Sequence, residues 1–397
     1  TTTHVMETTG KNYAKLMQIF SLIPNSMQYE PNDQIGIPWD LNKIAQLLFF
    51  IALSATVVGL ICARTKAKRW WTGGLGLLLS AVLLTGYFIP VSVPVMDLSA
   101  ASETADTTYY DMIHKDCQKD EAADFRVKKY QLDFSVGLNL TGSAKVYVDR
   151  SELKSYRFTL YHGYKVKQVT DQTGAALDFR REYDYVTVTR GGAAVEYLCL
   201  EYTGKSPKYY SSYAGVCLPA NFAYYPIPGY LELFMDSYYG FIDCSLPYDT
   251  AFDVHCSGRK QMYCNLAARG DNHFAGNARS ITLLSGYYDT LKLNNTLVVY
   301  PKYADTEIRA RIKKNMGTFT KQHRDIRTIF IMDACNLTPY EHLRSYDGYV
   351  VTNSMIDMEQ SYFESQIDIS KMDFYKTFVY YYNEKVDREE LEQLKQS

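Results

Sequence analysis

The sequence has no excess of positive charge. Its 397 residues include 42 Lys and Arg against 44 Asp and Glu, which gives a formal net charge of −2. Proteins that bind nucleic acid concentrate basic residues on one face, so nucleic acid is excluded as an expected partner. Charged residues make up only 22% of the chain and hydrophobic residues 47%, which is too apolar for a largely disordered protein. We therefore expect a packed fold.

Short catalytic motifs are absent as well. The sequence contains no GxSxG, no Walker loop and no GxGxxG, and no two of its histidines stand four residues apart, so the zinc-binding pattern HExxH is also missing. The densest group of metal-capable side chains is Asp253, His255, Cys256 and Cys264. In a strand, Asp253 and His255 would face away from Cys256. We expect no catalytic residue, no metal site and no cofactor.

Tryptophan is scarce, with 3 residues against 36 Tyr and 18 Phe. Two stretches, residues 46–63 and 73–90, are free of charged side chains, and each approaches the roughly 20 residues that span a hydrocarbon core. Trp39, Trp70 and Trp71 lie near their ends, where tryptophan marks the membrane–water interface. We expect two transmembrane helices, a hairpin over residues 44–95, anchored by these rings. The alternative is a pair of core helices in a soluble domain, which usually carry a polar stripe that is missing here.

The loop between the two stretches is basic, with four cations in six residues: Arg64, Lys66, Lys68 and Arg69. Short loops rich in Lys and Arg stay in the cytoplasm. We therefore expect a multi-pass protein of the cell membrane, with its N-terminal flank and everything after about residue 95 outside the cytosol. Small residues four positions apart would let the two helices approach closely, namely Ala55 with Gly59 and Gly76 with Ser80.

The flank at residues 1–43 has apolar residues at helical spacing before Pro24. This spacing predicts a short amphipathic helix, either on the outer membrane surface or packed on the external domain. Residues 96–124 are expected to form a linker. The chain begins at Thr1 with neither an initiator Met nor a signal peptide. An external N-terminus needs something upstream to carry it across, so we expect a longer or processed polypeptide.

From Phe125 onward the sequence has period-2 alternation. Apolar residues occupy every second position from Tyr130 to Leu140, which predicts one long strand with a single buried face. Shorter runs, separated by turn residues, continue to about residue 300. We expect a mainly antiparallel β-sandwich over residues 125–300. Helical spacing and two short apolar strands after Pro301 predict a small α/β subdomain over residues 301–397.

Several runs carry a family likeness: YQLDFSVGLNLTGSAKVYVD, YLCLEYTGKSPKYY and FAYYPIPGY. They resemble the N-terminal β domain of the zinc aminopeptidases of the aminopeptidase N family. The later run SITLLSGYYDTLKLNNTLVVYP is similar to the exit of that domain into the catalytic one. Together with the hairpin, the chain resembles ABC-type transporter permeases that carry such a domain outside the membrane. This likeness implies a transporter ATPase or a permease subunit as partners.

The resemblance also implies one candidate residue. The segment Asp357-Met358-Glu359-Gln360 falls about where the family has its substrate-amine motif, Gly-x-Met-Glu-Asn. The likeness therefore implies that Glu359 binds a substrate amine, although the Gly and the Asn of the motif are missing. The alternative is an ordinary surface glutamate.

The segment from Tyr209 to Tyr239 is dense in Tyr, Pro and Gly. Rings and hydroxyls beside strand edges suit a peptide ligand or a partner subunit. We expect an aromatic binding surface made of Tyr209, Tyr210, Tyr213, Tyr224, Tyr225 and Tyr230. The alternative is that these rings simply pack the domain. Seven of the eight cysteines lie outside the first predicted span, and we expect most of them to be buried and reduced.

The sequence thus predicts a membrane-anchored, non-catalytic, extracytoplasmic binding or structural module, in contact with the lipid bilayer and part of an ABC-type permease. The first alternative is the N-terminal portion of a membrane-bound zinc aminopeptidase whose HExxH lies downstream. A third reading is a stand-alone sensor or adhesin.

Overall fold

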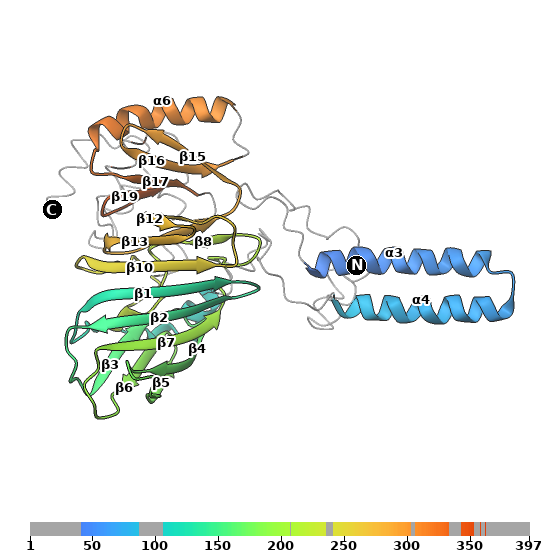
Figure 1. Ribbon diagram of the computed structural model, residues 1–397, viewed down its shortest axis with the longest axis horizontal. Helices are drawn as coiled ribbons and strands as arrows, with labels where there is room; N and C mark the ends of the chain where they lie inside the picture. The colour runs from blue at the N-terminus through green and yellow to red at the C-terminus, as the bar shows by residue number, and fades with distance from the viewer. Residues whose placement is uncertain are drawn as a thin grey trace. The chain divides into compact units, whose positions relative to one another are not determined.

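The computed structural model describes residues 41–86, 106–206, 208–235, 241–302, 306–332 and 343–352, together with Met358 and Tyr362. These residues belong to two compact units. One contains a pair of long helices, and the other contains all the described strands (Figure 1).

The first unit is a helical hairpin. Helices α3 (Leu41–Cys62) and α4 (Lys66–Gly86) lie side by side (Figure 1). The segment Ile44–Cys62 of α3 has a mean hydropathy of 2.4 and is long and apolar enough to cross a membrane, the one such helix among the described residues. Helix α4 starts inside the basic stretch, so its first turns are charged. The two predicted helices are present, and only the first has the length and composition of a span.

Glycines form the seam between these two helices. A methyl group added at Gly59 would lie 2.6 Å from Thr72 Cγ2, and one added at Gly76 would collide with the side chain of Thr56. Ser80 is also buried, and its hydroxyl donates to the Gly76 carbonyl at 2.8 Å. The predicted close approach is therefore confirmed at three of the four small residues. The fourth, Ala55, is exposed.

The largest sheet of the second unit has seven strands in the order β12-β13-β10-β1-β2-β7-β4. Every neighbouring pair is antiparallel except β1 and β10, which are parallel. In spatial order the strands span Ala267–Gly270, His273–Ala278, Thr250–Ser257, Val127–Val136, Leu140–Val148, Tyr197–Gly204 and Tyr164–Thr170.

Two smaller sheets complete the β-rich region. One has the order β5-β6-β3-β9, and the other has the order β11-β14-β8. The first comprises Phe179–Glu182, Tyr185–Thr189, Ser155–Thr159 and Ile227–Pro228, and the second Tyr263–Cys264, Leu283–Ser285 and Val216–Leu218. The expected β-rich domain is confirmed, and it is more elaborate than a two-sheet sandwich.

The alternation that predicted one long strand belongs to two strands. Tyr130, Leu132 and Phe134 are buried on one face of β1 as expected. The chain then turns at Gly137, whose N–H donates to the Asn139 carbonyl at 3.1 Å. The alternation of apolar and polar residues resumes in β2 at Leu140. The single strand that was predicted is therefore a hairpin of two strands, and the sequence alternates through its turn without a break.

A five-stranded sheet follows, in the order β15-β16-β17-β19-β18. Its strands span Tyr288–Leu293, Thr296–Pro301, Thr328–Ile331, Tyr349–Thr352 and Leu343–Tyr346, and helix α6 spans Thr306–Gln322. Strand β16 pairs with β17 in parallel, so the expected domain boundary at residue 301 falls inside this sheet.

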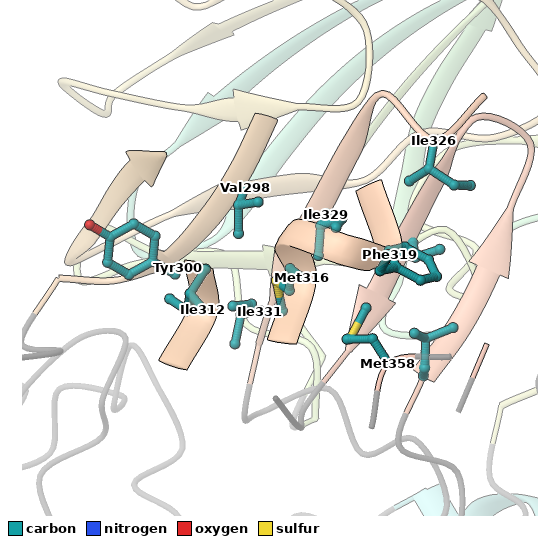
Figure 2. Packing of buried hydrophobic residues seen from close by; sticks show 11 residues of the cluster. Val298, Tyr300, Ile312, Met316, Phe319, Ile326, Ile329, Ile331 and Met358 are labelled. Carbon is teal, nitrogen blue, oxygen red and sulfur yellow. The ribbon is translucent and has the colours of Figure 1, made fainter. Parts of the chain in front are cut away.

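Helix α6 covers one face of the five-stranded sheet (Figure 1). Ile312, Met316 and Phe319 recur at helical spacing and are fully buried. Figure 2 shows them packed against residues of the sheet such as Val298 and Ile329, with Met358 at the edge of the same cluster. The predicted α/β arrangement after residue 301 is therefore present, and it includes two strands that precede that residue.

Candidate functional site

The outer surface of the α3–α4 hairpin is apolar over almost its whole length. Large hydrophobic side chains point outward from both helices, including Ile51 at 55%, Val58 at 58%, Ile61 at 74% and Leu75 at 68% exposed. A water-soluble protein rarely leaves an apolar patch of this extent uncovered. The hairpin surface is therefore suited to an apolar environment.

The predicted interface anchors lie at one end of this surface. Trp70 and Trp71 are 81% and 79% exposed at the start of α4. Such amphipathic rings are most stable at the boundary between an apolar phase and water. Trp39 lies outside the described residues.

The four predicted loop cations are all exposed, with Arg64 in the turn between the helices and the other three in the first turn of α4, and we call residues Ala63–Arg69 the elbow. Arg69 Nε donates to the Ala63 carbonyl at 3.1 Å, and the Lys68 N–H donates to Thr65 Oγ1 at 3.3 Å. Helix α3 has no basic residue in its own last turn, so Arg69 supplies the cation that a helix C-terminus favours. These bonds hold the elbow in one conformation.

The predicted aromatic binding surface is corrected by the structure. Five of its six tyrosines are buried, with exposed fractions from 0% at Tyr224 to 9% at Tyr230. Tyr213 is half-buried. These rings therefore lie in the interior between the sheets and cannot line a binding surface, so the packing alternative holds.

Hydrogen bonds explain why tyrosine rather than phenylalanine occupies several buried positions, among them Tyr130, Tyr202 and Tyr224. Tyr130 Oη donates to the Pro226 carbonyl at 2.9 Å, Tyr202 Oη to the Tyr224 carbonyl at 2.9 Å, and Tyr224 Oη to the Ile281 carbonyl at 2.8 Å. Burial raises the pKa of all three hydroxyls well above the ordinary tyrosine value. They remain neutral and donate hydrogen bonds to carbonyls that have no partner in a helix or sheet, because the backbone there is irregular.

The structure brings together a buried polar cluster that the sequence analysis did not predict. Asp106 is 2% exposed, and one of its oxygens accepts from Tyr161 Oη at 2.6 Å while the other has no hydrogen-bond partner among the described residues. Burial raises the pKa of Asp106 to about 6. Asp184 Oδ1 accepts from the His162 N–H at 2.6 Å, and His162 Nδ1 lies 3.3 Å from the same oxygen.

A short π-helix, η1 (Thr108–Ile113), contacts this cluster. The ring of Tyr109 stacks on His162 with centroids 3.5 Å apart, and Tyr110 Oη lies 3.3 Å from His162 Nδ1. The cluster therefore fastens η1 to the loop between strands β3 and β4. Residues that are far apart in sequence meet here, and their spacing gave no signal.

The metal-capable group from the sequence is divided between two faces. Asp253 and His255 lie on the solvent face of β10, and Cys256 is buried on the other. His273 Nε2 lies 2.7 Å from Asp253 Oδ1 and lowers the pKa of that carboxyl. Among the described residues, no three His, Cys, Asp or Glu side chains are placed to hold a metal ion. Glu359 lies outside the described residues.

The described cysteines are all free thiols. Cys217, Cys244, Cys256 and Cys264 are buried, Cys117 and Cys199 are half-buried, and Cys62 is exposed on α3. Burial raises the pKa of the Cys264 thiol to about 12. Burial also raises the pKa of the Cys244 and Cys256 thiols, so these three thiols are protonated and behave as small apolar residues.

No family model matches the chain, and no curated protein matches it. Similar solved structures include the native leukotriene A4 hydrolase of Saccharomyces cerevisiae, with 10% identity and a TM-score of 0.42 over 65% of this chain and 47% of that chain. A second is an M1 zinc metallopeptidase from Deinococcus radiodurans bound to a Tyr-Ser-Ala substrate, with 12% identity and a TM-score of 0.38 over 62% of this chain and 64% of that chain. The chain spans less than two thirds of the length of each.

Proposed function

We propose that this chain is a membrane-anchored protein, with the α3–α4 hairpin in the bilayer and the β-rich unit as a non-catalytic binding or structural module outside the cytosol. The observation that carries the proposal is the apolar outer surface of the hairpin, on which residues such as Ile61 and Leu75 are mostly exposed. Lipid tails would cover this surface without leaving polar groups unsatisfied, because the backbone N–H and C=O groups of a helix form hydrogen bonds with each other.

The glycine seam supports the same proposal. Lipid tails are as apolar as leucine, so helices in a bilayer associate through close packing of small residues rather than by excluding water. Gly59 and Gly76 provide this contact between α3 and α4. The hydroxyls of Thr56 and Ser80 donate to carbonyls of their own helices at 2.7 and 2.8 Å, which suits an environment without water.

Membrane extraction tests the anchoring. The full chain is expected to stay in the membrane fraction after alkaline carbonate washing and to be released only by detergent. A protein that is monomeric and soluble without detergent would contradict the proposal. The topology is tested by labelling Cys62, which is exposed next to the elbow. Because the half-buried Cys117 and Cys199 can react from the other side, the labelling is compared with that of the Cys62→Ser variant. The signal of a membrane-impermeant maleimide that this variant loses is expected to come from the cytosolic side only.

The proposal includes a transporter context, in which the chain is part of an ABC-type permease and contacts its ATPase. Support comes from the sequence resemblance and from the combination of a hairpin with a β-rich unit. Purification in mild detergent is expected to recover the ATPase subunit in a stoichiometric complex. A peptide ligand is no longer part of this proposal, because the tyrosines assigned to bind it are buried.

A second candidate is the N-terminal portion of a membrane-bound zinc aminopeptidase. One observation favours it: Met358, the residue that precedes Glu359 in the sequence, is 2% exposed and belongs to the buried cluster between α6 and the five-stranded sheet. Sequencing the gene beyond the codon for Ser397 distinguishes the candidates. An HExxH downstream, together with zinc and aminopeptidase activity in the purified product, would support the enzyme and overturn the non-catalytic module.

A further inference from the structure

The cations of the elbow have no acidic partners in the described part of the chain. None of the ion pairs found there includes Arg64, Lys66, Lys68 or Arg69. Elsewhere in the described residues, some cations do form ion pairs, as Arg157 does with Glu121 at 2.6 Å and with Asp124 at 2.9 Å. Four exposed positive charges within six residues repel one another unless anions from outside the chain neutralise them.

The elbow also presents these charges at a defined depth. Trp70 and Trp71 follow Arg69 directly, and both rings are about four-fifths exposed. Interfacial tryptophans lie at the level of the lipid headgroups. The bond from Arg69 Nε to the Ala63 carbonyl fixes the start of α4 against the end of α3, so the neighbouring cations cannot move far from that level.

We propose that the elbow is a binding surface for anionic phospholipid headgroups, with Arg64, Lys66 and Lys68 as the residues in contact with the phosphates. This inference rests on the proposed membrane anchoring. Clusters of four or more Lys and Arg next to a membrane segment select anionic lipids, because the leaflet on the cytosolic side carries the negative charge. Each such cation is worth roughly a fivefold local enrichment of the anionic lipid.

Tryptophan quenching tests this inference directly. Of the three tryptophans in the chain, two adjoin the elbow, so the Trp39→Phe variant of the full chain reports on the elbow alone. It is reconstituted in phosphatidylcholine vesicles that contain either brominated phosphatidylglycerol or brominated phosphatidylcholine at equal mole fraction. We expect the anionic quencher to be several-fold more effective, and the difference to shrink at high salt.

Charge reversal supplies the matched comparison. In the Trp39→Phe background, Lys66→Glu with Lys68→Glu is expected to bring the ratio of the two quenching constants to about 1. The control, Lys313→Glu with Lys314→Glu, makes the same change in charge at exposed positions of α6 in the β-rich unit and should leave the ratio unchanged.

The outcomes separate this inference from the proposed function. Equal quenching by both lipids in the parent protein would overturn lipid selectivity while leaving the anchoring intact, because either quencher reaches rings in the bilayer. Absence of quenching by both lipids would overturn the anchoring itself. If the control pair lowered the ratio of the quenching constants as much as the elbow pair does, the net charge of the protein, and not the elbow, would account for the lipid selectivity.

Discussion

Replacing Asp106 by Asn is expected to remove a specific pH dependence of stability. The carboxyl of Asp106 is buried, with one oxygen accepting from Tyr161 Oη and the other without a partner in the part of the chain that the structure describes. The pKa of this carboxyl is raised from 3.8 to about 6, mainly by burial and to a smaller extent by the nearby Asp184. The hydrogen bond from Tyr161 and the charges of His162 and Lys208 lower it by less. The folded state therefore holds this proton more tightly than the unfolded chain.

The sign and size of the effect follow from that difference. Below pH 3.8 the carboxyl is neutral in both states, and its contribution to stability is fully present. As the pH rises through about 6, the folded protein has to bury a charge, and that contribution is lost. A pKa of about 6 instead of 3.8 corresponds to about 3 kcal/mol of unfolding free energy between the two limits. The amide of the Asp106→Asn variant would carry no charge at any pH, so the variant should not lose this contribution.

The assay is urea unfolding of the full chain in detergent micelles over this pH range. All three tryptophans precede residue 72, so the β-rich unit is followed through the near-ultraviolet circular dichroism of its buried tyrosines. The quantity of interest is the difference in unfolding free energy between Asp106→Asn and the parent, because other titrating groups cancel in it. This difference should rise by about 3 kcal/mol with increasing pH. A difference that stays constant would refute the assignment of a buried, weakly ionised carboxyl.

Three further predictions rest on matched positions. Asp171 accepts hydrogen bonds from the hydroxyl and the N–H of Thr173, and these bonds lower the pKa of its carboxyl. The Asp171→Asn variant should therefore be less stable than the parent at neutral pH, and the two unfolding free energies should converge as the pH falls through the carboxyl range. This trend is opposite to that at Asp106, and urea unfolding measures both. Gly76→Ala should destabilise the hairpin by about 1–3 kcal/mol in mixed micelles followed by helical circular dichroism, whereas Gly74→Ala should not, because nothing lies within 4 Å of an added methyl there. Tyr130→Phe should reduce the free energy of unfolding by about 1 kcal/mol in urea unfolding. Tyr225→Phe should leave it unchanged, because the Tyr225 hydroxyl has no hydrogen-bond partner within the described ranges.

Local periodicity predicted the elements better than it predicted their partners. The buried face of β1 at Tyr130, Leu132 and Phe134 could be read directly from the alternation. Its parallel pairing with β10 joins Lys129 to Ala251, and no local pattern specifies a partner more than a hundred residues away. For the same reason the local pattern of Thr296–Pro301 did not indicate that β16 pairs in parallel with β17, beyond residue 301.

The polar cluster shows a second limit of the sequence. Asp106 and His162 stand in stretches without any motif, and a lone Asp or His on the surface has the same sequence signature as a buried one. Their significance comes from Tyr161 and Asp184, which reach them only after β3 and β6 have paired in the four-stranded sheet. A signal of this kind requires three-dimensional contacts. The elbow, by contrast, is a contiguous run, and sequence alone located every one of its cations.

The misassigned tyrosines follow from the dual character of their side chain. A tyrosine suits a wet surface because its hydroxyl binds water, but the same hydroxyl suits an interior that contains unpaired carbonyls. The segment around Tyr224 is rich in proline and lies between the short strands β8 and β9 without forming a strand itself, so its backbone leaves carbonyls such as that of Pro226 outside any ladder. Tyr130 and Tyr202 donate to carbonyls of this segment from the seven-stranded sheet. A Tyr-rich segment that is also rich in Pro and flanked by strands is therefore better interpreted as irregular core, in which the hydroxyls replace missing backbone partners, than as a binding surface.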